Sequence, residues 1–152
     1  MSRLKNVGVA LLLMSSLTGL MMTAACVGGG GTADTKVNWV YSWEEAKSRA
    51  ESEGKLIMID FYADWCKPCK QLDSTTYSDE DLGAFLNENV VSLKVNVDKS
   101  SLDGQYKVSA IPTIVFVSTE GVVIGNKLVG YRDAGTLRRE TETILDQWSP
   151  QS

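Results

Sequence analysis

The chain has 152 residues, with 15 Lys and Arg, 19 Asp and Glu, three Cys and no His. This length suits one domain of ordinary size, and the hydrophobic fraction of 43% suffices for a packed core. The lack of His excludes Ser-His-Asp and Cys-His catalytic pairs. A net charge of −4 argues against nucleic acid as a partner. Three Cys without His are too few for a tetrahedral zinc site, so we expect no metal and no bound cofactor.

The first 25 residues have the pattern of an export signal. Arg3 and Lys5 precede an apolar block that begins at Val7, and the segment ends with the small residues Ala24 and Ala25. An uncleaved transmembrane anchor is the alternative, because about 20 apolar residues can span a bilayer. Either arrangement leaves the positive N-terminus inside and exports the rest of the chain.

Residues 20–26 resemble the end of a bacterial lipoprotein signal, in which small residues precede a Cys that becomes the lipid-modified N-terminus. That residue is Cys26, and ordinary cleavage would instead leave it as a free thiol. Four consecutive Gly, residues 28–31, make the following segment flexible. We therefore predict a signal peptide at 1–25, a lipidated Cys and tether at 26–37, and a globular domain at 38–150. The domain would lie on the periplasmic side of a bacterial membrane or, without the lipid, would be soluble in the periplasm.

The rest of the chain alternates predicted helices and strands. The capping box from Ser42 to Glu45 predicts a helix that ends near Glu53, before Gly54. The apolar run 56–62 is too short for a buried helix and predicts a central strand. The later predicted elements are a helix over 66–75, a short helix from 78, an alternating strand over 90–97, a short helix near 101–107, a hairpin of strands 113–117 and 122–128, and a final helix capped by Asp133. This order predicts a three-layer α/β domain.

Cys66 and Cys69 carry the predicted chemistry, because they open a helix that directly follows a buried strand. The unpaired N–H groups of the helix start favour a thiolate at Cys66, which we expect to be the more exposed of the two, and Lys67 adds positive charge. Cys66 is then the attacking nucleophile, and Cys69 is the resolving thiol. Pro68 fits the helix start, where its missing N–H costs nothing. Half a zinc site and a static disulfide are the alternatives, and the strand–CxxC–helix context favours a redox-active pair.

Residues 61–69, Phe-Tyr-Ala-Asp-Trp-Cys-Lys-Pro-Cys, resemble the active-site segment of the thioredoxin family. Residues 111–113, Ile-Pro-Thr, resemble the cis-proline loop of that family. The resemblance covers residues 39–148 and implies a thioredoxin-like fold with a central mixed β-sheet flanked by helices. Residues 62–66 and 76–79 are most similar to the C-terminal thioredoxin-like domain of the DsbD membrane reductases.

The resemblance implies roles for three charged residues. Asp60, the one charge in an apolar strand, matches the buried carboxylate that assists proton transfer at the resolving Cys, with a solvated strand end as the alternative. Lys94 matches the Lys that pairs with this acid, with a solvent-facing strand residue as the alternative. Asp73, four residues after Cys69, matches an acidic residue near the site of DsbD-like domains, with a solvated helix charge as the alternative.

A substrate-binding surface is also implied. Pro112 is expected to be cis, rather than a trans residue that ends a loop, and to expose the backbone of Ile111 for strand-like pairing with substrate. Trp65 is expected to be a partly exposed platform beside the Cys pair, with Lys67 and Pro68 next to it. The other Trp residues, 39, 43 and 148, are interpreted as packing residues.

The functional prediction is an exported, membrane-tethered thiol:disulfide oxidoreductase that reduces protein disulfides. The residues between the two Cys do not include the His found in strongly oxidising relatives, and Asp60 suits reductive exchange. The expected partners are exported proteins with disulfides, a membrane thiol reductant as electron donor, and membrane lipid through Cys26; the chain is expected to be a monomer. The alternatives are a disulfide-forming oxidase or isomerase, and a non-catalytic binding module on the same fold.

Overall fold

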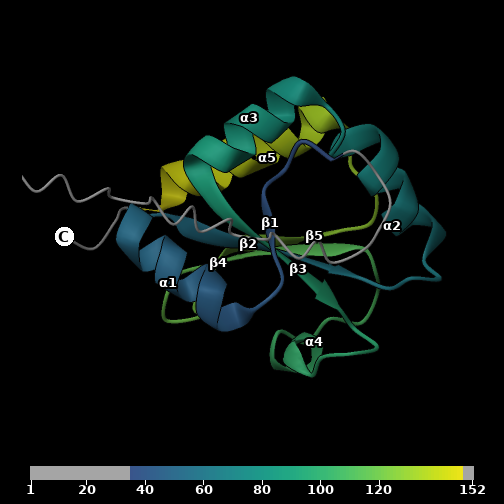
Figure 1. The fold of residues 1–152 in the computed structure, drawn as a ribbon, viewed down its shortest axis with the longest axis horizontal. Coiled ribbons are helices and arrows are strands. Elements are labelled where there is room, and N and C mark those ends of the chain that lie inside the picture. The colour runs from purple at the N-terminus through teal and green to yellow at the C-terminus, as the bar shows by residue number, and fades with distance from the viewer. Residues whose placement is uncertain (1–34, 149–152) are drawn as a thin grey trace, which may run out of the picture. The chain divides into compact units, whose positions relative to one another are not determined.

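The computed structural model describes residues 35–148, so the predicted signal segment and Cys26 lie outside the described part of the chain. Five strands form one sheet that helices cover (Figure 1). The elements are β1 (Trp39–Val40), α1 (Trp43–Glu53), β2 (Leu56–Tyr62), α2 (Lys67–Gln71), the π-helix η1 (Leu72–Thr76), α3 (Glu80–Asn89), β3 (Val90–Asn96), α4 (Leu102–Gln105), β4 (Thr113–Val117), β5 (Val123–Val129) and α5 (Ala134–Gln147). Of these helices, none is long and apolar enough to cross a membrane.

The sheet is mixed, and its strand order is β1-β3-β2-β4-β5. β3 runs parallel to β1 and to β2, whereas β4 pairs antiparallel with β2 and with β5. The central position of β2 is the one that its continuous apolar run predicted. The register places Asp60 of β2 opposite Lys94 of β3 and Ile114 of β4. The last pairing, between β4 and β5, is the predicted hairpin.

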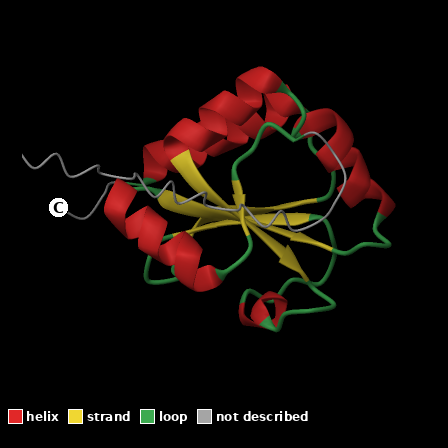
Figure 2. Cartoon of the chain, viewed as in Figure 1, coloured by secondary structure: helices red, strands yellow, loops and turns green. Residues whose placement is uncertain are grey.

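Alternate residues of β2 point to opposite faces of the sheet and enter two separate cores. Leu56 and Met58 pack in one core with side chains of α3 and α5. Ile57 and Ile59 pack in the other core with side chains of α1. Figure 2 shows the helices above and below the strands. The arrangement confirms the predicted three-layer α/β class and its mixed sheet.

Helix ends follow the signals in the sequence. Ser42 caps α1 by accepting a hydrogen bond from the N–H of Glu45, and Gly54 ends this helix with a left-handed backbone (φ 63°). Asp133 caps α5 in the same way, because its carboxylate accepts from the N–H of Thr136 at 2.9 Å. These caps fix where α1 and α5 begin, as predicted.

Two elements differ from the prediction. The helix expected over 66–75 is α-helical only as far as Gln71 and continues as the π-helix Leu72–Thr76. The strand expected to alternate over 90–97 is buried along its whole length, 90–96. The reason is that β1 and β2 flank β3 at its two edges while α1 and α3 contact it. The alternation of apolar residues thus predicted a strand here, and the structure covers both faces of that strand.

The N-terminal edge of the domain includes a strand and core contacts that the sequence did not predict. Trp39 and Val40 form the short strand β1, which is too short to show a period of its own. Val37 is 5% exposed and belongs to the core, and the N–H of Lys36 donates to the carbonyl of Tyr77 at 2.7 Å. Packing on the domain thus begins before residue 38.

Candidate active site

The two Cys of the CxxC segment form a disulfide, with their Cα atoms 5.3 Å apart. β2 ends at Tyr62, and a short turn brings Cys66 to the N-cap position of α2. The Cys66 sulfur accepts a hydrogen bond from the N–H of Cys69 at 3.2 Å. Pro68 occupies the first turn, where a missing N–H is tolerated. A donor aimed at the Cys66 sulfur stabilises negative charge on it, which is the electrostatic condition for a reactive thiolate.

The expectation that Cys66 is the more exposed Cys is wrong for the disulfide state, because both residues are 3% exposed. Both pack with Ala63, and the partly buried Val97 and Ile111 lie against this group. Exposure therefore does not distinguish the two sulfurs. Position does: Cys66 precedes the helix, whereas Cys69 lies within it.

The loop before β4 lies beside the Cys pair. The Ile111–Pro112 peptide bond is cis. Ile111 packs against the Cys cluster, and the Pro112 carbonyl accepts from the N–H of Gly130 at 2.8 Å. The Cys66–Cys69 segment and the Ile111–Pro112 loop, which lie far apart in the sequence, thus come together in the structure.

Trp65 stands exposed next to Cys66, with 67% of its surface accessible. Its indole N–H donates to the Asp98 carboxylate at 2.9 Å, which fixes the ring. Lys67 and Pro68 are exposed, in line with a surface open to a protein partner. Asp98 is not among the site residues that the sequence predicted. Only its position at the end of β3, in the turn closed by the bond from its own N–H to the Asn96 side chain, could have indicated it.

Asp60, Lys94 and Asp73 meet in one ionic cluster. The Lys94 ammonium lies 3.4 Å from Asp60 Oδ2 and also contacts Asp73 Oδ1. Asp60 is 1% exposed and Lys94 8%, so the solvent-exposed alternatives for these two residues are wrong. The Asp73 side chain, on η1, is 24% exposed. The structure thus brings together all three charged residues that the resemblance selected.

Burial dominates the electrostatics of this cluster. The pKa of Asp60 is raised from 3.8 to about 6: burial is the largest cause, the Lys94 charge opposes it, and the Asp73 charge adds to it. Burial alone would lower the pKa of Lys94, but Asp60 and Asp73 raise it above its ordinary value. Asp60 therefore exchanges its proton near neutral pH while Lys94 stays charged.

Three aromatic rings surround the Lys94 ammonium. It lies 4.7 Å from the centre of the Trp39 ring and 5.1 Å from those of Tyr62 and Tyr77. Trp39 and Tyr77 also meet edge to face, with ring centres 4.8 Å apart. The Tyr77 hydroxyl forms no hydrogen bond with a described residue, yet it lies close enough to Asp60 to lower the pKa of that carboxyl. The sequence showed Trp39 only as a packing residue, and Tyr77 only as part of the 76–79 segment that resembles DsbD-like domains.

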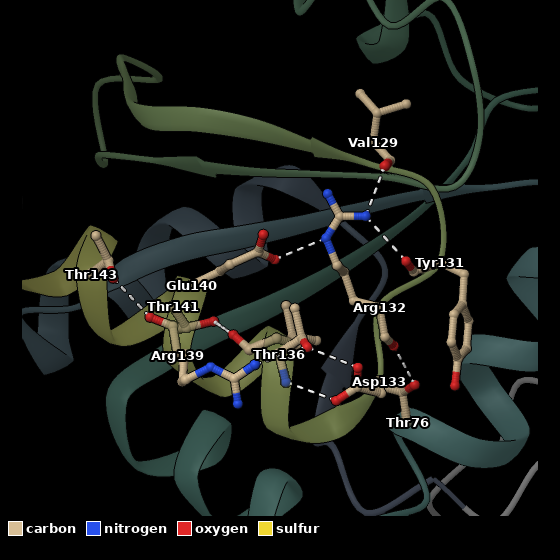
Figure 3. Close-up of polar contacts among 11 residues, drawn as sticks. Thr76, Val129, Tyr131, Arg132, Asp133, Thr136, Arg139, Glu140, Thr141 and Thr143 are labelled. Atoms are coloured by element: carbon tan, nitrogen blue, oxygen red, sulfur yellow. Dashed lines mark hydrogen bonds and ion pairs between the residues drawn. The ribbon is translucent and has the colours of Figure 1, made fainter.

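The loop between β5 and α5 holds η1 in place. The Thr76 hydroxyl donates to the carbonyl of Arg132 at 2.6 Å. The Arg132 side chain in turn donates to Glu140 of α5 and to the carbonyl of Val129, both at 2.9 Å (Figure 3). Because the same loop contacts Pro112, it connects the segment that carries Asp73 with the loop beside the Cys pair.

The part of the chain between residues 35 and 148 contains no group of three or more Cys, Asp or Glu side chains that could hold a metal ion. That the protein needs no cofactor stays a prediction. The Cys pair can exchange electrons, and the neighbouring Asp60 can exchange a proton.

Comparisons with known proteins agree with this geometry. A family model described as thioredoxin-like matches residues 38–119. The chain is 28% identical over 130 residues to the thiol:disulfide interchange protein DsbD of Haemophilus influenzae, a match that covers 81% of the chain and 22% of that relative. The chain thus spans much less than the whole of this curated relative.

Two solved structures share the fold. A thioredoxin from Thermus thermophilus has a TM-score of 0.63 and 27% identity, with 72% of this chain and 87% of that chain covered. The oxidised C-terminal domain of Neisseria meningitidis DsbD has a TM-score of 0.56 and 19% identity, with 66% and 90% covered, and shows the fold alone. The predicted resemblance to thioredoxins and to DsbD is confirmed. The chain belongs to the thioredoxin-like family of thiol:disulfide oxidoreductases.

Proposed function

We propose that the chain is an exported, membrane-tethered reductase of protein disulfides. The observation that carries the proposal is the Cys66–Cys69 disulfide at the start of α2, beside the exposed Trp65 and the Ile111–Pro112 loop. A reversible disulfide in this setting exchanges with thiols and disulfides of other proteins. The buried acid Asp60 on β2 supplies the proton acceptor that the exchange requires.

The reaction transfers two electrons from the reduced Cys pair to a substrate disulfide. The Cys66 thiolate attacks one substrate sulfur and forms a mixed disulfide, and the displaced substrate thiolate takes up a proton. Cys69 then gives its proton to Asp60 and attacks the Cys66 sulfur. The second substrate thiolate leaves, and the chain is left with the Cys66–Cys69 disulfide seen in the structure. A thiol reductant must return two electrons before the next cycle.

The burial of Asp60 and its place on β2 support the proposal that it exchanges its proton with Cys69. It lies two residues before Tyr62 on β2, so both side chains point to the same face of the sheet. Tyr62 packs against the cluster that contains Cys69. With a pKa of about 6, the Asp60 carboxylate accepts a proton at neutral pH and releases it readily. Lys94, which contacts both Asp60 and Asp73, opposes the rise in this pKa that burial causes, and the Asp73 charge adds to that rise.

Export and tethering are proposed from the sequence. The segment 1–25 would direct export, and Cys26 would carry the lipid that holds the domain at a membrane. The partners would then be exported proteins with disulfides and a membrane thiol reductant. Labelled fatty acid tests the anchor: it should enter the native chain and not a Cys26→Ala variant. Equal labelling of both would refute the tether and leave the redox proposal intact.

Trapping in cells tests the redox proposal. The Cys69→Ser variant lacks the resolving thiol, so it should accumulate mixed disulfides at Cys66 that dithiothreitol releases. Cys66→Ser is the matched control, because it removes the nucleophile and should trap much less. The same two variants separate the alternatives. A non-catalytic binding module would give no trapped partner with either variant. A disulfide-forming oxidase would trap mainly newly exported proteins whose own disulfides are still being formed.

A further inference from the structure

A pocket opens beside the exposed face of Trp65. Its volume is about 360 Å³, near the lower end of the range for ligand sites, so it can take one long side chain. Two of its residues, Val97 and Ile111, also pack against the Cys66 cluster, so the pocket adjoins the exchanging sulfurs. We call it the Asp103 pocket, and its lining is Trp65, Val97, Asp103, Val108, Ser109, Ala110 and Ile111.

Asp103 is the one charged side chain of this lining, and the other walls are mainly apolar. It lies in α4 and is partly exposed. Within residues 35–148, its carboxylate takes part in no ion pair with a Lys or Arg, although Lys107 follows one turn later. A second carboxylate, Asp98, lies close by, because it holds the indole of Trp65. The neighbouring cation Lys99 is paired with Asp64. The pocket therefore combines an apolar floor with unbalanced negative charge.

We propose that the Asp103 pocket receives a lysine or arginine side chain of the protein whose disulfide reacts at Cys66. This inference rests on the proposed function and adds a preference among its substrates. Long basic side chains have an apolar stem and a charged head, so the stem suits Val97, Val108 and Ile111 while the head reaches Asp103. An acidic side chain would bring like charges together, and a short apolar one would leave Asp103 without a partner.

Single-turnover oxidation of the reduced full chain measures this preference. Two disulfide peptides are compared that differ only in Arg or Glu two residues from the reactive Cys. The readout is the ratio of their second-order rate constants, so a general loss of activity cancels. We expect the Arg peptide to react about threefold faster, as for a partly exposed ion pair, and the ratio to approach one in 1 M salt.

Variants assign the preference to one residue. Asp103→Asn should bring the ratio close to one, and Asp103→Lys should invert it. The matched control is Asp146→Asn on α5, which removes the same charge elsewhere and should keep the native ratio. A native ratio of one, or an unchanged ratio in Asp103→Asn, would overturn the inference while peptide reduction itself would uphold the proposed function. If neither peptide oxidises the chain, the proposed function falls and the pocket assignment falls with it.

Discussion

Replacing Asp60 by Asn should make the oxidised protein more stable at neutral pH. The folded-state pKa of Asp60 is about 6, against 3.8 for the ordinary carboxyl. Because the pKa is raised, the folded state binds this proton more tightly than the unfolded chain does. The contribution of Asp60 to the free energy of unfolding is therefore fully present below about pH 4 and is lost as the pH rises through 6. Two pKa units correspond to about 3 kcal/mol. Asn carries no charge to bury, and Lys94 keeps Asp73 as its partner.

Urea unfolding of the native chain and Asp60→Asn between pH 4 and pH 8 checks this reasoning. The variant should be more stable by about 3 kcal/mol at pH 8, with the gap shrinking towards zero near pH 4. The matched control is Asp64→Asn, whose exposed side chain pairs with the exposed Lys99 and should change stability by less than about 0.5 kcal/mol at any pH. A variant that is less stable at pH 8, or a gap independent of pH, would refute the assignment of a buried, destabilising charge.

Three further substitutions test other parts of the structure by urea unfolding. Lys94→Met leaves two carboxylates without their cation and should cost about 3–5 kcal/mol at pH 8, with a smaller cost at pH 5, where Asp60 is protonated. Asp79→Ala removes the cap that accepts from the N–H of Leu82 and should cost about 1 kcal/mol. Gly83→Ala should cost about 1–3 kcal/mol, because a Cβ there would lie 2.5 Å from that of Lys36.

Each of these has an outcome that would contradict it. A pH-independent loss in Lys94→Met would mean that the aliphatic stem, and not the charge, stabilises the fold. Asp79→Asn is the control for the cap, since Asn also caps helices, and it should be close to native. Gly104→Ala is the control for Gly83, since no atom of residues 35–148 lies within 4 Å of a Cβ added there. Equal losses in the two glycine variants would exclude the proposed clash.

Local signals predicted the central strand and the position of the Cys pair. The apolar run predicts β2, and Pro68 predicts the start of α2. Both signals come from residues close together in the sequence, and these two elements follow each other directly in the structure. Asp60 stood out for the same reason, as a charge within an apolar run. These features depend on short-range periodicity and helix capping, which one sequence displays directly.

The surroundings of Lys94 depend instead on contacts between distant segments. Trp39 comes from a two-residue strand, and Tyr77 follows a π-helix that no residue pattern indicated. Their positions around the ammonium are set by how β1 and η1 pack on the sheet. The bond from Trp65 to Asp98 likewise joins residues 33 positions apart. From the sequence alone, Lys94 could equally face solvent or pair with Asp60. The structure buries Lys94 because both faces of β3 are covered.

The reduction potential of the Cys66–Cys69 couple tests the central claim most directly. The full chain is equilibrated in glutathione or dithiothreitol buffers of known potential, and the fraction of free Cys66 and Cys69 thiols is read by alkylation and mass spectrometry. A reductase should titrate as a reversible two-electron couple below about −200 mV, towards the value of about −270 mV known for thioredoxin. A midpoint near −120 mV, the value of a strong disulfide-forming oxidant, would contradict the reductase assignment. A disulfide that no buffer reduces would contradict dithiol exchange altogether.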